Sequence, residues 1–252
     1  MKVKDVMSKN VVFVNPDDPV SAAFTKINKN NVNQLPVMDG KTYLGMITLK
    51  DVAVKDINPS EAKCGHFVAK TPSIRSNDDV EGAISLLLTS GFRAIPVIDD
   101  FLVGIISETD VLKIISKNYG NIQLSKIATE CEYVSKSDVI GKVKRIMIDK
   151  NVSRVPVLDK NNVIGIVGLA DMTRLLEGKG PMPVRGRGKE PGTKEKLNLN
   201  DSEVGNFMHK PFISKGDVLL KNVIDSLAKN GEVILIENGV SIVTPKDVLE
   251  LA

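Results

Sequence analysis

Aromatic residues and long apolar runs are scarce in this sequence, and both shortages narrow the possible architectures. Phe, Trp and Tyr together make up 4% of the 252 residues, with no Trp, so the core must consist of Val, Ile, Leu and Met. Because Val and Ile favour strands, we expect many short buried strands. No stretch approaches the roughly 18 apolar residues of a membrane span, and the N-terminus lacks the apolar core of a signal peptide. These features predict a cytoplasmic protein without a membrane segment.

Groups that usually carry catalysis or bind metals are also few. Cys64 and Cys131 stand 67 residues apart, which fits neither a disulfide framework nor a metal-ligand pair, and we expect both to be small, mostly buried residues. The two histidines, His66 and His209, are far apart in the sequence. No Gly-rich phosphate loop, dinucleotide fingerprint or nucleophile elbow occurs. We therefore predict a protein that is not an enzyme, with no metal site and no required cofactor.

Charge is nearly balanced, with 34 Lys and Arg against 31 Asp and Glu, which does not by itself predict a nucleic-acid or membrane partner. Residues 178–202 differ, because Gly, Pro and charged side chains dominate this stretch and leave too few apolar groups for a core. We interpret it as a flexible basic linker. Nucleic-acid binding through its basic side chains is the alternative. These side chains are Lys179, Arg185, Arg187, Lys189, Lys194 and Lys196.

An internal repeat organises the rest of the chain. Pro36, Pro96 and Pro156 recur every 60 residues, each followed by Val inside an apolar run that ends in Asp. A degenerate fourth copy, at residues 233–238, lacks the proline. Each copy continues through a short polar turn into a second apolar run, which is typical of an antiparallel hairpin.

An amphipathic helix is expected upstream of each hairpin. In the second copy, apolar residues from Val80 to Leu87 have helical spacing, and Gly91 follows as a C-terminal cap. Short polar residues such as Asp79 are expected to cap the helix N–H groups. A short strand such as Val11–Val14 should precede each helix, and a second helix should begin after the terminal Asp of each copy. The fold class is thus α/β (α+β), with four strand-helix-strand-strand-helix units that gain stability by pairing.

These residues resemble the cystathionine β-synthase (CBS) domain family. The resemblance rests on the Val-rich first strand, the helix ending near Gly, the hydrophobic-Pro-Val-hydrophobic-Asp strand and the following Gly-hydrophobic-hydrophobic-Ser/Thr-x-x-Asp. It implies two tandem pairs, called Bateman modules, over residues 1–120 (repeats 1–57 and 65–120) and 121–252 (repeats 121–177 and 203–252). It also implies that packed sheets flanked by helices form clefts for AMP, ADP, ATP or an S-adenosylmethionine derivative.

The recurring Ser/Thr-x-x-Asp suits a nucleotide. A hydroxyl and free N–H groups at a helix start can meet a phosphate, and a carboxylate can accept hydrogen bonds from ribose hydroxyls. An ordinary helix cap is the structural alternative. In the family the Asp holds ribose and the hydroxyl lies near phosphate. The third copy lacks this hydroxyl, because it has Gly168 at that position. The matching positions are Thr48 with Asp51, Ser107 with Asp110, Asp171 alone, and Thr244 with Asp247.

Two further groups of positions follow from the resemblance. Arg93 and Arg154 lie just before the Pro-Val strand, where the family often places a phosphate-contacting cation; a solvated surface charge is the alternative. The segment leading into each first strand would hold adenine, with Thr71 and Pro72 as the best candidates. The other positions of this kind are Val11, Val12, Cys131, Glu132, Lys210 and Pro211.

Together these features predict a non-catalytic sensor that binds an adenine nucleotide as a regulatory ligand. The resemblance implies a homodimer of stacked modules that acts on a separate, unknown regulated protein. A purely structural dimerisation scaffold with vestigial clefts is a further alternative.

Overall fold

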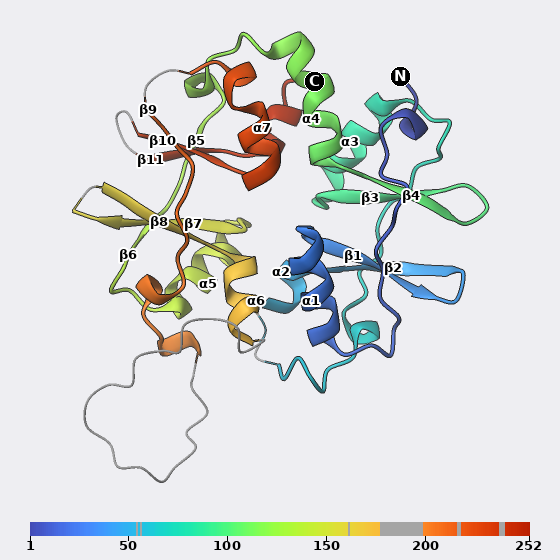
Figure 1. Cartoon of the computed structure of the whole chain (residues 1–252), viewed down its shortest axis with the longest axis horizontal. Coiled ribbons are helices and arrows are strands. Elements are labelled where there is room, and N and C mark those ends of the chain that lie inside the picture. The colour runs from blue at the N-terminus through green and yellow to red at the C-terminus, as the bar shows by residue number, and fades with distance from the viewer. Residues whose placement is uncertain (54, 56, 161, 177–198, 216–217, 237–239) are drawn as a thin grey trace. The chain divides into compact units, whose positions relative to one another are not determined.

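A computed structural model describes residues 1–53, 55, 57–160, 162–176, 199–215, 218–236 and 240–252, and it contains the predicted hairpin and its flanking helices in each of the four repeats (Figure 1). Repeat 1 contains α1 (Val20–Asn30), β1 (Gln34–Asp39), β2 (Thr42–Thr48) and α2 (Leu49–Ala53). Repeat 2 contains α3 (Val80–Ser90), β3 (Ala94–Ile98), β4 (Leu102–Ser107) and α4 (Glu108–Tyr119). Repeat 3 contains β5 (Thr129–Glu130), β6 (Val134–Ser135), α5 (Ile140–Asp149), β7 (Arg154–Asp159), β8 (Asn162–Gly168) and α6 (Leu169–Leu176). Repeat 4 contains β9 (Ile213–Lys215), α7 (Leu220–Asn230), β10 (Val233–Ile236), β11 (Val240–Val243) and α8 (Pro245–Leu249).

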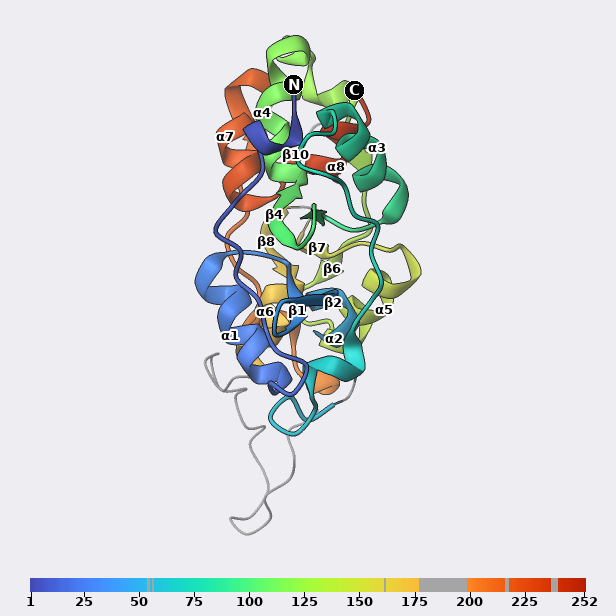
Figure 2. The same ribbon diagram turned by 90° about the vertical axis from the view of Figure 1, so that its right-hand side faces the viewer.

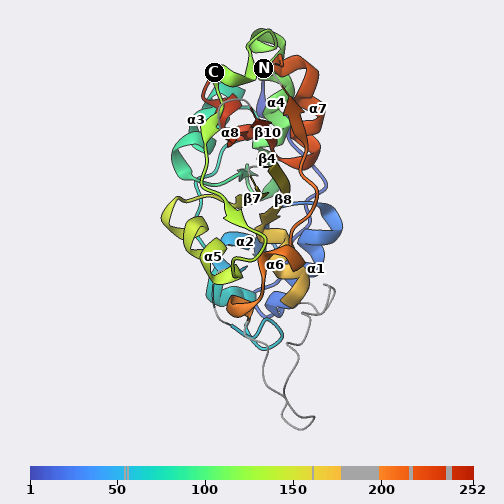
Figure 3. The same ribbon diagram turned by 90° about the vertical axis from the view of Figure 1, so that its left-hand side faces the viewer.

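The predicted hairpins are antiparallel pairs, β1 with β2, β3 with β4, β7 with β8 and β10 with β11. The first helix of each repeat packs on its hairpin, as α1 does on β1 (Figure 2) and α5 does on β7 (Figure 3). Apolar helix faces and Val- and Ile-rich strands therefore bury one another, as the periodicity predicts. These mixed α/β units confirm the predicted fold class.

The strand expected before each first helix is much shorter than predicted. In place of a strand over Val11–Val14, only Val14 forms a bridge, to Val37, and in repeat 2 only Ile74 does so, to Val97. Repeats 3 and 4 retain two and three residues, in β6 and β9. The chain ahead of the first of these strands lies on the hairpin of another repeat, where Ser8 bridges Ile105 of β4.

We call the stretches ahead of the first strands lead segments, residues 1–10, 58–71, 120–130 and 199–210. They cap the first helices of neighbouring repeats. The N–H of Val20 donates to Ala62 O and that of Val80 donates to Met1 O, each at 2.9–3.0 Å, so repeats 1 and 2 cap one another. Ile140 donates to Ser202 O and Leu220 to Ile122 O, both at 2.9 Å, which pairs repeats 3 and 4 in the same way.

The expected polar side-chain caps are therefore wrong for these helices. None of α1, α3, α5 and α7 has a side-chain hydrogen bond at its N-cap. The aspartates ahead of three of them stabilise the preceding turn instead, as Asp78 does by accepting from the N–H of Arg75 at 2.9 Å. A backbone carbonyl from the paired repeat instead accepts the N–H of the first residue of each helix, which has no partner inside the helix.

Glycine recurs in the hairpins where a lead segment crosses them. A Cβ atom at Gly45 would lie 2.5 Å from the carbonyl oxygen of Ala69, and one at Gly104 would lie 2.6 Å from Met7 Sδ. At Gly165 the nearest atom, Met208 Sδ, would be at 2.5 Å. At Gly45 the close neighbour is backbone, so only glycine permits the approach; at Gly104 and Gly165 the closest neighbours are methionine side chains of the lead segments. The recurring glycine of the hairpin therefore makes room for the paired repeat.

The chain divides into two compact units, one of residues 1–52, 57–130 and 211–252, the other of residues 53–56 and 131–210. In the first unit α4 packs against both α7 and α8 (Figure 2), and repeats 2 and 4 share one apolar core. The module boundaries at residues 1–120 and 121–252 stay a prediction. Of the predicted linker 178–202, residues 199–201 form a short 3-10 helix and Ser202 is buried, whereas residues 178–198 lie outside the described residues.

Candidate functional site

Four aspartates occupy the same place, the first turn of the helix that follows each hairpin. In repeats 2, 3 and 4 the carboxylate Oδ2 accepts the backbone N–H three residues earlier, from Ser107, Gly168 and Thr244, at 2.7–2.8 Å. Each carboxylate is at least partly buried. The predicted set Asp51, Asp110, Asp171 and Asp247 is thus built by one repeated piece of local geometry.

The three predicted hydroxyls contact these same carboxylates. Thr48, Ser107 and Thr244 each donate to Oδ2 of the aspartate three residues later at 2.6 Å. Ser107 Oγ also accepts the N–H of Asp110 at 3.3 Å, which completes a capping box. The Ser/Thr-x-x-Asp motif is therefore a helix cap in this structure, and the cap holds the carboxylate in a fixed orientation.

Lead segments bring a second set of polar side chains to the carboxylates, which the sequence reasoning missed. Ser8 Oγ lies 3.5 Å from Asp110 Oδ1, and Thr129 Oγ1 donates to Asp247 Oδ1 at 3.1 Å. In the third repeat His209 Nδ1 lies 2.8 Å from Asp171 Oδ2. The sequence does hold a signal for these contacts. Three lead segments carry a polar residue at the matching position, namely Ser8, Thr129 and His209.

Burial affects the Asp110 carboxyl most clearly. Removal from water raises its pKa, and hydrogen bonds from Ser107 and Ser8 partly oppose this rise. The cause of the shift is the packing of α4 together with the lead segment that covers its start. A carboxylate in such a place interacts strongly with whatever donor replaces water.

The two predicted arginines have different surroundings. Arg93 Nε donates to Glu108 Oε2 at 3.0 Å, and the two side chains are only 24% and 10% exposed. Glu108, at the start of α4, therefore already neutralises the predicted phosphate contact in repeat 2. Arg154 is half-buried and lies directly across the β7–β8 ladder from Gly168, the residue whose N–H donates to Asp171.

Comparison with known proteins identifies the family. The CBS domain model matches residues 3–57, 64–117 and 124–178. The chain belongs to the CBS domain family. The match covers three repeats, and the fourth CBS-like unit has the same order of elements in the structure, β9, α7, β10, β11 and α8.

Two relatives of this CBS protein come from Methanocaldococcus jannaschii. Protein MJ1404 is 29% identical over 181 residues, 68% of this chain and 42% of MJ1404, so the chain spans less than half of that relative. Protein MJ1225 is 23% identical over 192 residues, 68% of this chain and 69% of MJ1225.

Two solved structures cover the whole chain. The crystal structure of MJ1225, described as a candidate archaeal homolog of g-AMPK, has a TM-score of 0.82 at 19% identity and covers 100% of this chain and 99% of its own. A protein from Pyrococcus horikoshii has a TM-score of 0.64 at 18% identity with the same coverage. These likenesses show the fold.

The segments expected to hold adenine in the CBS repeats have varied contacts. Thr71 Oγ1 shares a hydrogen bond of 2.7 Å with Tyr43 OH, next to the half-buried Pro72, and burial raises the pKa of Tyr43. Val11 and Val12 are half-buried, Lys210 is exposed and Pro211 is buried. The structure brings none of these into hydrogen-bond contact with the four aspartates within the described ranges.

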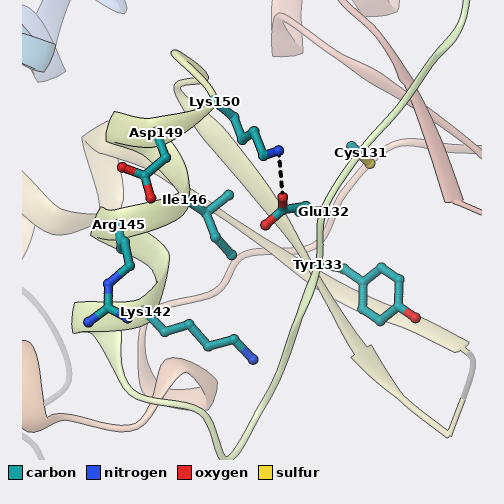
Figure 4. Close-up of a pocket in the computed structure, with 8 residues that line it drawn as sticks. All are labelled: Cys131, Glu132, Tyr133, Lys142, Arg145, Ile146, Asp149 and Lys150. Atoms are coloured by element: carbon teal, nitrogen blue, oxygen red, sulfur yellow. Dashed lines mark ion pairs between the residues drawn. The ribbon is translucent and has the colours of Figure 1, made fainter.

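Cys131 and Glu132 line an open groove of about 490 Å³ beside α5 (Figure 4). Glu132 pairs with Lys150 at 3.0 Å across it. Burial raises the pKa of Cys131 to about 11, as it does that of the buried Cys64, so neither thiol has reactive character.

The described residues contain no helix long and apolar enough to cross a bilayer. They also contain no group of three or more His, Cys, Asp or Glu side chains placed to hold a metal ion.

Removal of one cap hydroxyl has a predictable effect. Ser107→Ala should lower the free energy of unfolding by about 1 kcal/mol, because Asp110 N–H and Oδ2 each lose a partner at the start of α4. Chemical denaturation measures the change. Ser116→Ala, near the exposed end of the same helix, is the control and should have a much smaller effect; equal losses would contradict a capping role for Ser107.

Proposed function

We propose that this protein is a non-catalytic regulator whose paired CBS repeats bind an adenine nucleotide, AMP, ADP, ATP or an S-adenosylmethionine derivative. One observation carries the proposal: in repeats 2, 3 and 4 a carboxylate fixed at a helix start contacts a side chain from the lead segment of the paired repeat. The fold likeness to a candidate g-AMPK homolog supports a regulatory role over a catalytic one.

The second repeat offers the best-equipped position. Asp110 begins α4, a helix of 12 residues whose N-terminal dipole favours an anion. Its Oδ2 is committed to the cap, while Oδ1 faces Ser8 at the long distance of 3.5 Å. A carboxylate oxygen accepts more than one hydrogen bond, so Oδ1 can accept a ribose hydroxyl as Ser8 turns aside.

Regulation follows from where the contacting groups come from. Asp110 belongs to repeat 2 and Ser8 to repeat 1, so a ligand that touches both changes the free energy of their pairing. A ligand shifts an equilibrium only through unequal affinity for its two states. We propose that this chain acts as a homodimer in the cytoplasm. A separate regulated protein then responds to the shift in repeat pairing.

The test measures thermal stabilisation of the full chain by millimolar AMP, ADP, ATP and S-adenosylmethionine. At least one should raise the melting temperature of the wild type, because a ligand that binds only the folded state stabilises it. Asp110→Asn should remove part of this increase. Asp78→Asn, an exposed turn aspartate of the same repeat, is the matched control and should keep it.

Two results would decide against the proposal. If no nucleotide stabilises the wild type, the paired repeats act as a scaffold. If Asp110→Asn and Asp78→Asn respond alike, the nucleotide binds at some place other than the start of α4. Isothermal titration calorimetry on the same three proteins then gives the number of sites.

A further inference from the structure

The aspartate of the third repeat, Asp171, has different hydrogen-bond donors from the aspartates of the other repeats. In the other repeats the residue three before the Asp supplies a hydroxyl to Oδ2, but here that residue is Gly168, which supplies only its N–H at 2.8 Å. Asp171 is nevertheless only 9% exposed, whereas Asp51, Asp110 and Asp247 are half-buried. A buried carboxylate that lost a donor would be costly, so another donor is required.

His209 occupies that position. Its Nδ1 lies 2.8 Å from Asp171 Oδ2, the same oxygen that the hydroxyls of Thr48, Ser107 and Thr244 contact in their repeats. The backbone holds the ring there, because His209 exchanges two hydrogen bonds of 3.0 Å with Ile166 of β8. The imidazole comes from the lead segment of repeat 4 and is 43% exposed on its other side.

We propose that His209 replaces the missing hydroxyl in repeat 3 and is the residue that positions Asp171 for a ligand there. The ligand part of this assignment rests on the proposed nucleotide binding; the positioning part does not. The replacement changes where the donor comes from: the other repeats use a hydroxyl of their own chain segment, whereas repeat 3 uses a side chain from the lead segment of repeat 4.

The geometry supplies a direct test of the exchange of donors. A Cβ atom at Gly168 would lie 3.5 Å from Asp171 Oδ2, 3.6 Å from Arg154 Cγ and 3.7 Å from Ser153 O, which are ordinary contacts. Gly168→Ser should therefore fold and restore the hydroxyl of the other repeats. The comparison uses the full chain without ligand as wild type, His209→Ala, Gly168→Ser and the Gly168→Ser/His209→Ala double variant.

His209→Ala should lower the melting temperature by about 2–4 °C, and the double variant should recover at least half of the loss. His66→Ala, the exposed histidine of repeat 2, is the control and should change nothing. If His209 only fills space, Gly168→Ser will not rescue His209→Ala, and the assignment is wrong. Should His209→Ala fail to fold alone, folding of the double variant is itself the rescue.

Calorimetry with AMP addresses the ligand. In an Asp110→Asn background, which weakens the second repeat, His209→Ala should raise the Kd of the remaining binding about tenfold and Gly168→Ser should restore it. If the wild type binds no AMP, the proposed function fails while the ligand-free rescue still decides the role of His209. If the wild type binds and His209→Ala leaves every Kd unchanged, His209 does not position Asp171 for the nucleotide.

Discussion

Gly45→Ala should lower the free energy of unfolding by about 3 kcal/mol, the largest effect of any single added methyl group that the structure suggests. The new Cβ would lie 2.5 Å from both Ala69 O and Val68 Cγ1. Ala69 cannot easily move away, because its backbone exchanges two hydrogen bonds with Met46 of β2. The φ of Gly45 is +151°, a conformation that residues with a Cβ rarely adopt. Chemical denaturation should show an early midpoint.

Gly82→Ala is the matched control for this change. Gly82 lies inside α3 on its exposed side, and an added Cβ would meet only Ile74 Cδ1 at an ordinary 3.6 Å. Alanine there should stabilise the protein by about 0.5–1 kcal/mol, since Gly is costly in a helix interior. If both variants change the free energy of unfolding in the same direction, the lead segment does not pack closely against Gly45 in solution.

Glu108→Ala should cost about 2–3 kcal/mol, a value reduced from that of a fully buried pair because Arg93 is 24% exposed. The substitution leaves the guanidinium without its carboxylate, and Arg93 Nη1 is already buried with no acceptor in the part of the chain that the structure describes. Urea unfolding of the variant measures the loss.

Two comparisons give that result its meaning. Arg93→Met/Glu108→Leu removes both charges and should recover most of the stability, because no charge is left buried alone. Asp17→Ala breaks the exposed pair with Lys63 and should leave stability unchanged within error. A Glu108→Ala protein as stable as the wild type would mean that Arg93 turns to solvent and is available to a phosphate after all.

The sequence predicted well whatever is local. Hairpins, helices and the Ser/Thr-x-x-Asp motif depend on residues within one repeat, so apolar periodicity and repeated spacing reveal them. Caps on the first helices were predicted wrongly for the same reason: Asp79 looks like a cap, but the carbonyl of Met1 performs that function from 79 residues away. No pattern within a repeat carries that information.

In the candidate site too, contacts within one repeat were predictable and contacts between repeats were not. Asp110 and Ser107 form a contact across three residues, and the motif predicts it. Ser8 meets Asp110 across 102 residues and His209 meets Asp171 across 38, through lead segments whose course the sequence does not show. Arg93 was predicted from its place ahead of a strand; its pairing with Glu108 depends on the first turn of α4 lying beside that strand end.

Reciprocal capping by lead segments limits how such a chain can be cut or extended. A single repeat taken alone would expose the helix start that Ala62 or Met1 covers and would carry a lead segment with nothing to rest on. Two adjacent repeats satisfy one another's backbone and need nothing more for this purpose. Repeats of this kind should therefore be gained and lost in pairs during evolution, because a single added repeat would leave backbone N–H groups without acceptors.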